Sequence, residues 1–375
     1  MSKEIQQILE KIKTFDENSP AVLATVADVR GSSYRLPGAR MLIAETGETF
    51  GTVSGGCLEA DVLEHARRVL RKGEPQLLTY DTTGKADSVF SLNMGCNGIV
   101  RILLEPARNN DFFDKVENYF QRRTRAVVAS LIASSDEERF KIGSRFFFDD
   151  SGGAVSDLDD EIERRLSADA ENVLASGVSQ CRIYEIGDER AEFFLEIINP
   201  PVNLFLFGAG YDAIPVAGFA KDLGWRVSVV DHRPAFAAPE RFPQADEILV
   251  LRPEDFSKKL ILGENSVAVI MTHNYAIDRE ILDFLLPQSV AYIGALGPKR
   301  RTENLLRELQ EKGSRFSQAQ LDKLYAPIGL DIGAANPEAI ALSIVAEIQS
   351  VLANRTGGFL RERQGSIYNR GANQI

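Results

Sequence analysis

Hydrophobic residues recur with helical spacing at the start of the chain and then gather in short strand-like runs. Positions i, i+3, i+4 and i+7 predict an opening amphipathic helix; they are Ile5, Ile8, Leu9 and Ile12. Apolar runs separated by turn residues predict three strands, over Ala21–Val29, Arg40–Ala44 and Thr49–Val53. A second helical face follows, made of Leu58, Val62, Leu63, Ala66, Val69 and Leu70, and Gly73 is expected to end that helix in a left-handed cap.

The stretch from residue 126 to 198 is similar to a degenerate second copy of residues 21 to 104. "AVLATV" at 21 corresponds to "AVVASL" at 126, "GARMLIAETG" at 38 to "GSRFFFDDSG" at 143, and "PQLLTYD" at 75 to "SQCRIYE" at 179. In the second copy "VSGGCLEADV" has become "VSDLDDEIER". A purely architectural motif would be needed in both copies, so the glycines and the thiol indicate a function. Chance similarity between two α+β stretches is the alternative.

The pattern changes at Asn199-Pro200-Pro201, where we expect a domain boundary. Apolar runs then alternate with helical segments, which is typical of a parallel sheet covered by helices; the runs are Val202–Phe207, Arg226–Val230, Glu247–Leu251, Ser266–Met271 and Val290–Ala295. The sequence therefore predicts an α/β protein with three parts. They are an N-terminal α+β domain with a degenerate internal duplication over 1–200, a Rossmann-like doubly wound parallel sheet over 201–355, and a tail over 356–375.

The stretch "NLFLFGAGYDAIPVAGFAKDLGWRVSVVD" has the order of a dinucleotide-binding unit: strand, glycine turn, helix, strand and acid. Gly208 permits the tight turn, Gly210 lets backbone approach a pyrophosphate, and Asp231 is spaced to accept from a ribose hydroxyl. Arg233 can hold a phosphate or be solvated. His273, after a later strand, can act as an acid or base, or simply form a hydrogen bond in a loop. The fold alone does not identify the ligand.

Composition limits the classes of partner and compartment. A net charge of -11 without a basic block makes nucleic acid and acidic membrane surfaces unexpected partners. No apolar run approaches the roughly 18 residues of a membrane helix, and the amino terminus lacks the apolar core of a signal peptide. Three separated cysteines, Cys57, Cys96 and Cys181, argue against a disulfide framework. We therefore expect a cytoplasmic protein with reduced thiols.

Cys57 follows Ser54-Gly55-Gly56 at the bend before a predicted helix. Unpaired amides of Gly56, Cys57 and Leu58 would favour an anion there. Half ionisation of the thiol at neutral pH requires its pKa to fall from about 8.5 to about 7, roughly 2 kcal/mol, whereas a helix end supplies about 0.3 to 1 kcal/mol. A second positive contribution, from an arginine or a metal, is therefore expected.

The stretch "RGSSYRLPGARM" offers candidate cations near hydroxyls and a Pro-Gly turn. Arg35 and Arg40, together with Ser32 and Ser33, suit phosphate binding, although solvated arginines are the alternative. Cys96, in a second turn, either lines the same site or packs locally, and Cys181 is expected in the core. A single thiolate suits a soft metal or sulfur transfer better than structural zinc.

Six stretches in order resemble the XdhC/CoxI family, the xanthine dehydrogenase accessory factors. They are "GSSYRLPGARMLI", "GTVSGGCLEADV", "LFGAGYDAIPVAGFAKDLGWRVSVVDHRP", "MTHNYAIDREIL", "YIGALGPKRR" and "PIGLDIGAANPEAIALSIVAEI". The resemblance implies a cytoplasmic chaperone that binds molybdenum cofactor, shields it during sulfuration and delivers it to a molybdenum hydroxylase. Tyr34, where many members have proline, and Asn97, where glycine is usual, depart from the family pattern.

The resemblance assigns Cys57 to the family's Ser-Gly-Gly-Cys position, as the contact to molybdenum or to the sulfur being delivered, with Cys96 as a second candidate ligand. The residues expected to hold the cofactor, as molybdopterin or its dinucleotide form, or a nucleotide such as NAD(P) in the Rossmann half, are Ser32, Ser33, Arg35, Arg40, Ser54, Gly55, Gly56, Gly208, Gly210, Asp231, Arg233 and His273. Expected partners are a xanthine dehydrogenase-like client, a cysteine desulfurase and a second copy of the chain.

Two other functions fit the same residues. An NAD(P)-dependent oxidoreductase would use Asp231 as the ribose anchor and His273 as an acid or base, but it leaves Ser54 to Cys57 unexplained. An interaction module would dock a hydroxylase without touching its cofactor. The chaperone interpretation predicts no enzymatic turnover beyond sulfur transfer.

Overall fold

The computed structural model describes residues 2–15, 19–82, 98–108 and 111–364. One compact unit is built from Met1–Pro200 and another from Pro201–Ile367. Among the described residues, no helix combines the length and the apolar character that crossing a membrane requires.

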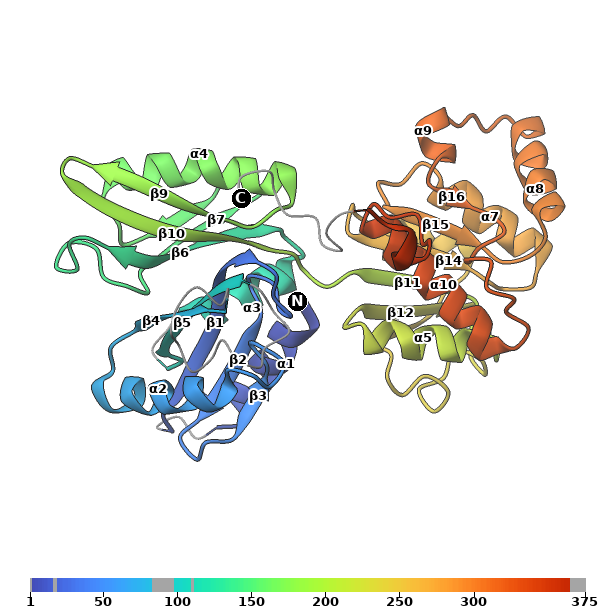
Figure 1. Cartoon of the computed structure of the whole chain (residues 1–375). Helices are drawn as coiled ribbons and strands as arrows, with labels where there is room; N and C mark the ends of the chain where they lie inside the picture. Colours follow the sequence, from blue (N-terminus) through green and yellow to red (C-terminus); the bar gives the residue numbers. More distant parts are fainter. Residues whose placement is uncertain (1, 16–18, 83–97, 109–110, 365–375) are drawn as a thin grey trace. The chain divides into compact units, whose positions relative to one another are not determined.

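The N-terminal unit contains two antiparallel five-stranded sheets with the same strand order (Figure 1). The first sheet has the order β3-β2-β1-β5-β4, with β1 (Ala21–Gly31), β2 (Arg40–Ala44), β3 (Thr49–Gly51), β4 (Gln76–Asp81) and β5 (Gly98–Pro106). The second has the order β8-β7-β6-β10-β9, with β6 (Ala126–Ser134), β7 (Arg145–Asp149), β8 (Ala154–Ser156), β9 (Gln180–Ile186) and β10 (Glu189–Ile198). We call β1–β5 with α2 the first copy, and β6–β10 with α4 the second.

The helices of this unit pack as their apolar spacing requires. They are α1 (Ser2–Lys13), α2 (Glu59–Lys72), α3 (Phe112–Arg122) and α4 (Asp160–Ser176). The four residues that predicted α1 are all buried, and α2 ends at Gly73 with φ 71°, which confirms the expected left-handed cap. The strand expected over Thr49–Val53 ends two residues earlier, at Gly51, where the chain turns with φ 87°.

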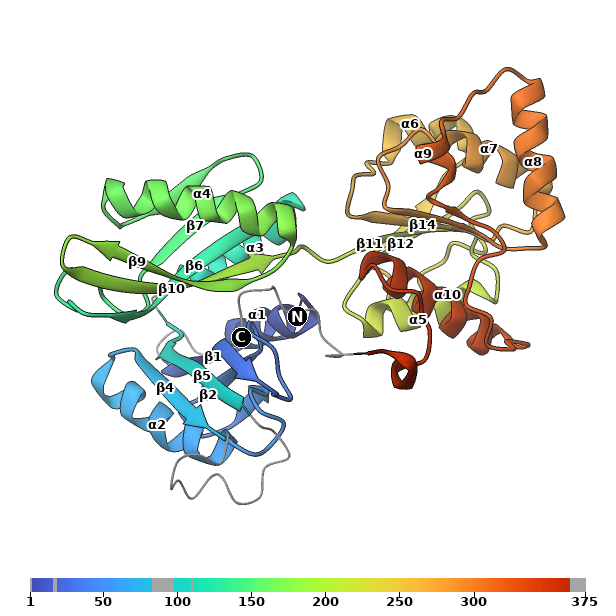
Figure 2. The same ribbon diagram turned by 45° about the horizontal axis from the view of Figure 1, so that its top comes forward.

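The two sheets are buried on both faces, because each has a helix on one side and apolar residues of the unit on the other. One cluster joins the first sheet to α2 and another joins the second sheet to α4. A further cluster combines α1 and α3 with residues of both sheets, including Leu23 and Val128. Figure 2 shows α2 and α4 on the outer sides of their sheets. This packing explains why the central strands lack simple alternation of apolar and polar residues.

Buried ion pairs join the two copies reciprocally. Arg40 of β2 donates to both carboxylate oxygens of Glu196 of β10, and Arg145 of β7 donates to Glu105 of β5. The Phe112 ring lies 4.6 Å from the guanidinium carbon of Arg40 and 5.1 Å from that of Arg145. Corresponding strands of the copies therefore exchange the same type of contact.

The C-terminal unit is a six-stranded parallel sheet, which confirms the expected α/β class. Its order is β13-β12-β11-β14-β15-β16, the 3-2-1-4-5-6 order of a Rossmann sheet. Its strands are β11 (Asn203–Phe207), β12 (Arg226–Asp231), β13 (Glu247–Val250), β14 (Ser266–Ile270), β15 (Tyr292–Ala295) and β16 (Leu324–Tyr325). Its helices are α5 (Ala213–Asp222), α6 (Phe256–Lys259), α7 (Tyr275–Leu285), α8 (Lys299–Glu311), α9 (Gln318–Leu321) and α10 (Pro337–Leu352), with short 3-10 turns at Pro253–Asp255 and Leu360–Glu362.

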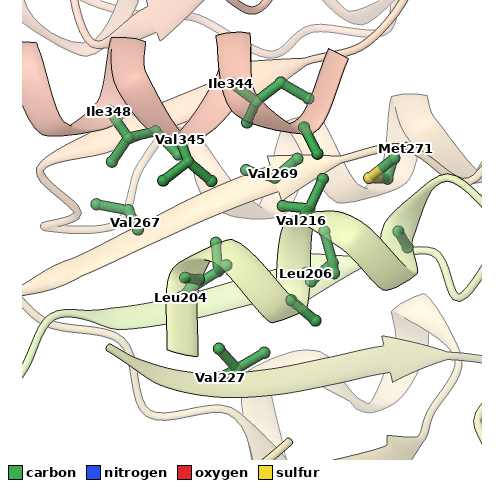
Figure 3. Close-up of a cluster of buried hydrophobic side chains, with 14 of the residues drawn as sticks. Leu204, Leu206, Val216, Val227, Val267, Val269, Met271, Ile344, Val345 and Ile348 are labelled. Atoms are coloured by element: carbon green, nitrogen blue, oxygen red, sulfur yellow. The ribbon is translucent and has the colours of Figure 1, made fainter. Parts of the chain in front are cut away.

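Helices α5 and α10 cover one face of this sheet. Figure 3 shows Ile344, Val345 and Ile348 of α10 above the sheet near Val216 of α5. A second cluster, including Phe207 and Ile281, lies on the other face with α6, α7 and α8. The chain crosses over between β11 and β14, so the loops after these strands meet at the point where Rossmann folds bind ligands.

Candidate functional site

The Gly-Gly-Cys turn connects β3 to α2 in the first copy. Gly55 and Gly56 have φ values of 82° and 114°, which side chains rarely tolerate. Leu58 is buried in the core between α2 and the sheet and anchors the end of the turn. Cys57 is exposed and its thiol is free. The backbone therefore presents the thiol to solvent while Leu58 holds the turn in place.

The carboxylate of Glu59 occupies the centre of this turn. It accepts from the backbone amides of Ser54, Gly56 and Leu58 and from the hydroxyls of Ser54 and Thr52. Burial raises the pKa of Glu59, but the hydrogen bonds from the two hydroxyls and the amide of Ser54 outweigh it and lower the pKa to about 2. The expectation of unpaired amides is therefore wrong for Gly56 and Leu58, because the chain's own carboxylate already fills the anion position.

Tyr34 brings the "GSSYRLPG" loop against the thiol turn. A Cβ atom placed on Gly55 would lie 2.7 Å from the Tyr34 ring, so the ring packs directly on the glycine. Ser32 is exposed and Ser33 half-buried, and the backbone of Ser32 lies against Gly98 at the start of β5. The structure thus places the loop and the turn side by side, as the sequence led us to expect, but through an aromatic contact.

The two arginines proposed for phosphate binding already have carboxylate partners. Arg35 pairs with Glu4 of α1. Arg40 is only 2% exposed, and its pairing with Glu196 joins the two copies. A buried arginine with a bidentate partner is a structural element, so Arg40 is not available to a ligand and its expected role is corrected here.

The other cysteines contribute less to this site. Cys96 lies outside the described residues. Cys181 in β9 donates to the carbonyl oxygen of Ala27 at 3.4 Å, and burial raises the pKa of its thiol to about 12. Within the part of the chain that the structure describes, no three histidine, cysteine or acidic side chains are grouped to hold a metal ion. Cys57 is thus the accessible thiol among the described cysteines.

In the C-terminal unit, Gly208 and Gly210 lie in the loop after β11. Gly208 has φ 108°, and a Cβ atom there would lie 2.5 Å from the carbonyl oxygen of Met271 at the end of β14. A Cβ atom on Gly210 would lie 2.5 Å from a carboxylate oxygen of Asp212. The first glycine is therefore required by close packing at the crossover. The second accommodates an acidic side chain, which disfavours a pyrophosphate at this position.

Asp231, the expected ribose anchor, is fully occupied by protein donors. Its oxygens accept from the amides of Ala209 and Arg233 at 2.8 and 2.9 Å, and from two guanidinium nitrogens of Arg233. Burial raises the pKa of Asp231, but these hydrogen bonds outweigh it and lower the pKa. The Arg233 guanidinium carbon also lies 3.9 Å from the ring centroid of Phe236. As folded here, Asp231 ties the glycine loop to β12 and has no acceptor capacity left for a ribose.

His273 lies in the loop after β14, at the crossover. Its backbone is left-handed with φ 59°, and its Nε2 lies 2.7 Å from a carboxylate oxygen of Asp212. Beside it, Thr272 donates to the buried Asp278, which also accepts from Arg301 at 2.6 Å. The loops after β11 and β14 are therefore linked by a histidine-carboxylate pair at the crossover.

Sequence reasoning missed three side chains that define these sites: Glu59, Tyr34 as a packing partner, and Asp212. A glutamate in the first turn after Thr52 and Ser54 was a usable signal, because acids at that position bind free amides and hydroxyls. The contacts of Tyr34 and Asp212 depend on loop geometry that spacing does not reveal.

Comparisons with known proteins match both halves of the chain. The model described as "XdhC and CoxI family" matches residues 15–81, and that described as "XdhC Rossmann domain" matches residues 204–348. A relative from Bacillus subtilis, named as a probable xanthine dehydrogenase component, is 33% identical over 89% of this chain and 93% of its own length. "Molybdenum cofactor insertion chaperone PaoD" of Escherichia coli is 23% identical over 88% of this chain and 83% of its own length. A crystal structure described as a xanthine dehydrogenase of Bacillus halodurans aligns with a TM-score of 0.75 and 32% identity, covering 95% of this chain and 97% of that one.

Proposed function

The chain belongs to the XdhC and CoxI family, and from this premise we propose that it is a maturation chaperone that binds molybdenum cofactor and delivers it to a xanthine dehydrogenase-type hydroxylase. The observation that carries the proposal is the similarity to a relative named as a molybdenum cofactor insertion chaperone, which extends over most of both chains. The cofactor is the cargo of such a protein. Its dithiolene-bound metal prefers soft ligands, and the pterin carries a phosphate.

Cys57 is the residue that suits the metal end of this cargo. Its thiol is free and exposed on a turn that two glycines and the Glu59 carboxylate hold in shape. A thiol of this kind offers molybdenum a soft sulfur ligand, and no bound metal is needed to fold the turn. The sulfuration of the cofactor, a desulfurase partner, a homodimer and a cytoplasmic location stay predictions from the resemblance.

The Rossmann unit gives less support to the rival oxidoreductase function. That function needs Asp231 as an acceptor for a ribose, whereas four protein donors already point at its two oxygens. Nucleotide binding would require Arg233 to release this carboxylate. We therefore place the cargo on the N-terminal unit in this proposal.

The test is the cofactor content of purified protein. We expect protein from a molybdate-fed host to retain molybdenum and pterin and to restore activity to a cofactor-free xanthine dehydrogenase. Cys57→Ala is expected to lose most of the bound molybdenum, while Cys181→Ala, which removes a half-buried thiol of the second copy, is expected to retain it. Absence of both molybdenum and pterin from wild-type protein would refute the proposed function, and equal molybdenum in the two variants would remove Cys57 from it.

A further inference from the structure

A groove of the N-terminal unit ends beside the thiol turn. It has a volume of about 390 Å³ and is lined by Lys3, Glu4, Gln7, Tyr34, Arg35, Leu36, Ala39 and Gly51. Helix α1 forms one wall, and the loop between β1 and β2 forms the other. Sites for small ligands are typically concave and of this size, with a few polar groups among apolar ones.

A second groove continues the first along α1. Its volume is about 500 Å³, and it shares Glu4, Gln7 and Gly51 with the first groove. Phe50 and Lys11 line its far part. The two hollows together form one channel that follows α1, and we call it the α1 groove.

Tyr34 connects the α1 groove to the Gly-Gly-Cys turn. Its ring lines the first hollow and also packs on Gly55, two residues before Cys57. The side chain is 66% exposed, although it is large and partly apolar, and its hydroxyl has no hydrogen-bond partner among the described residues. Gln7, on the facing helix, is exposed and likewise lacks a partner there. A planar ring with hydrogen-bonding edges would satisfy both side chains at once.

Lys11 supplies an available positive charge at the other end of the groove. Its ammonium lies 4.2 Å from the ring centroid of Phe50. Within the described part of the chain it has no carboxylate partner, unlike Lys13 on the same helix, which pairs with Glu117. An ammonium held over an aromatic ring without a counter-ion favours an anionic group of a ligand.

We infer that the α1 groove binds the pterin of the cofactor, with the ring system stacked on Tyr34 and the phosphate directed toward Lys11. The inference rests on the proposed function and extends it to residues other than Cys57. The metal end then lies at the Tyr34 end of the groove, on the side of the thiol turn. Glu59 keeps its place in this arrangement, so the turn binds no phosphate.

The experiment uses full-length protein purified from a host that cannot make the cofactor. It is titrated with molybdenum cofactor freshly released from a purified molybdenum hydroxylase, and bound pterin is measured by fluorescence after oxidation. Tyr34→Ala is expected to weaken pterin retention about tenfold, since stacking on an aromatic side chain is worth about one power of ten in affinity. Tyr34→Phe keeps the ring and is expected to restore most of the retention.

Lys11→Gln is expected to weaken retention about threefold at low salt, with a smaller difference at high salt, as for an exposed charge. Lys13→Gln is the matched control, because Lys13 lies on the same helix but lines a different hollow, and it is expected to retain the pterin. Melting curves check that each variant is folded.

The outcomes separate this inference from the proposed function. Pterin retained equally by wild type, Tyr34→Ala and Lys11→Gln would overturn the α1 groove and leave the chaperone function intact. No retention by wild type under any condition would remove both. Loss of molybdenum without loss of pterin in Cys57→Ala, together with pterin loss in Tyr34→Ala, would support the division between metal and pterin ends.

Discussion

The two copies of the N-terminal unit share a framework but differ at the turn that enters their outer helix. In both, a serine hydroxyl after the short third strand accepts from a leucine amide, Ser54 from Leu58 at 2.8 Å and Ser156 from Leu158 at 3.1 Å. In both, the same hydroxyl donates to a glutamate of the following helix. These shared contacts fix the helix to the sheet and are therefore structural.

The difference is confined to the residues between serine and helix. The first copy has two glycines with positive φ and an exposed thiol. The second, which the structure describes throughout this turn, has no positive φ there and starts α4 with Asp159 accepting from the amide of Ile162. Because the sheet forms equally well with the ordinary cap, the Gly-Gly-Cys turn is not needed for folding. The comparison supports a function for the first turn and none for the second.

The largest effect is expected where the copies are most alike. Arg40→Met leaves the Glu196 carboxylate buried without its partner, and removing one member of a buried pair costs about 3 to 5 kcal/mol. Arg145→Met, at the corresponding strand of the second copy, is expected to cost a similar amount through Glu105. Urea unfolding followed by circular dichroism measures both.

A built-in control localises these losses. The chain has one tryptophan, and Trp225 is buried in the C-terminal unit, so its fluorescence reports that unit alone. We expect its transition to stay unchanged, and Arg40→Met combined with Glu196→Leu to recover most of the loss. A cost below about 1 kcal/mol for Arg40→Met would contradict the structural role given to this pair.

A moderate effect is expected at Gly55 of the first turn. Gly55→Ala forces an L side chain into φ 82° and against the Tyr34 ring, which together cost about 1 to 3 kcal/mol. Adding Tyr34→Ala removes the clash but not the backbone strain, so the double variant is expected to recover part of the loss. Equal stability of Gly55→Ala and wild type in urea would show that the turn is not held as described.

A smaller effect with a defined pH dependence is expected at Glu59. Its pKa in the folded protein, about 2, lies below the ordinary value of 4.5, so its carboxylate stabilises the fold above pH 4.5 and loses this effect as the pH falls toward 2. Because the group is partly exposed, Glu59→Gln is expected to cost only about 1 to 2 kcal/mol at pH 7. The difference from wild type should shrink steadily below pH 4.5. A difference that grows on acidification would exclude the hydrogen bonding given to Glu59.

The smallest effect on stability is expected at Cys57 itself. Its side chain is exposed, so Cys57→Ala should change the free energy of unfolding by less than about 0.5 kcal/mol. Thiol labelling sharpens the contrast between the copies in a Cys96→Ser background. There Cys57 should react in the native protein, whereas Cys181, whose pKa is about 12, should react fully only after unfolding. Native labelling of Cys181 at the rate of Cys57 would contradict this.

The fold could be predicted further from the sequence than the site. Helix α1, strand β2 and the cap at Gly73 follow from periodicity and glycine chemistry, and the repeat in the sequence corresponds to two sheets of one strand order. Short-range patterns determine such elements because neighbouring residues share a face or a turn.

The site was less predictable because its partners are distant in sequence. Arg40 looked available for phosphate until Glu196, more than 150 residues away, was found to pair with it. Asp231 has the spacing of a ribose anchor, yet the nearby Arg233 folds back onto it. A charge pattern identifies which groups are available but not which of them are already neutralised.

The exchange of arginine and glutamate between the copies has the form of an isologous interface, in which one patch on each protomer meets its equivalent on the other. Here a single polypeptide supplies both halves of this pseudo-twofold arrangement, with Phe112 touching both arginines. An ancestral pair of identical chains would have to keep two active turns or lose both. Covalent linkage removes that restriction, since one half can become a scaffold and the other can specialise.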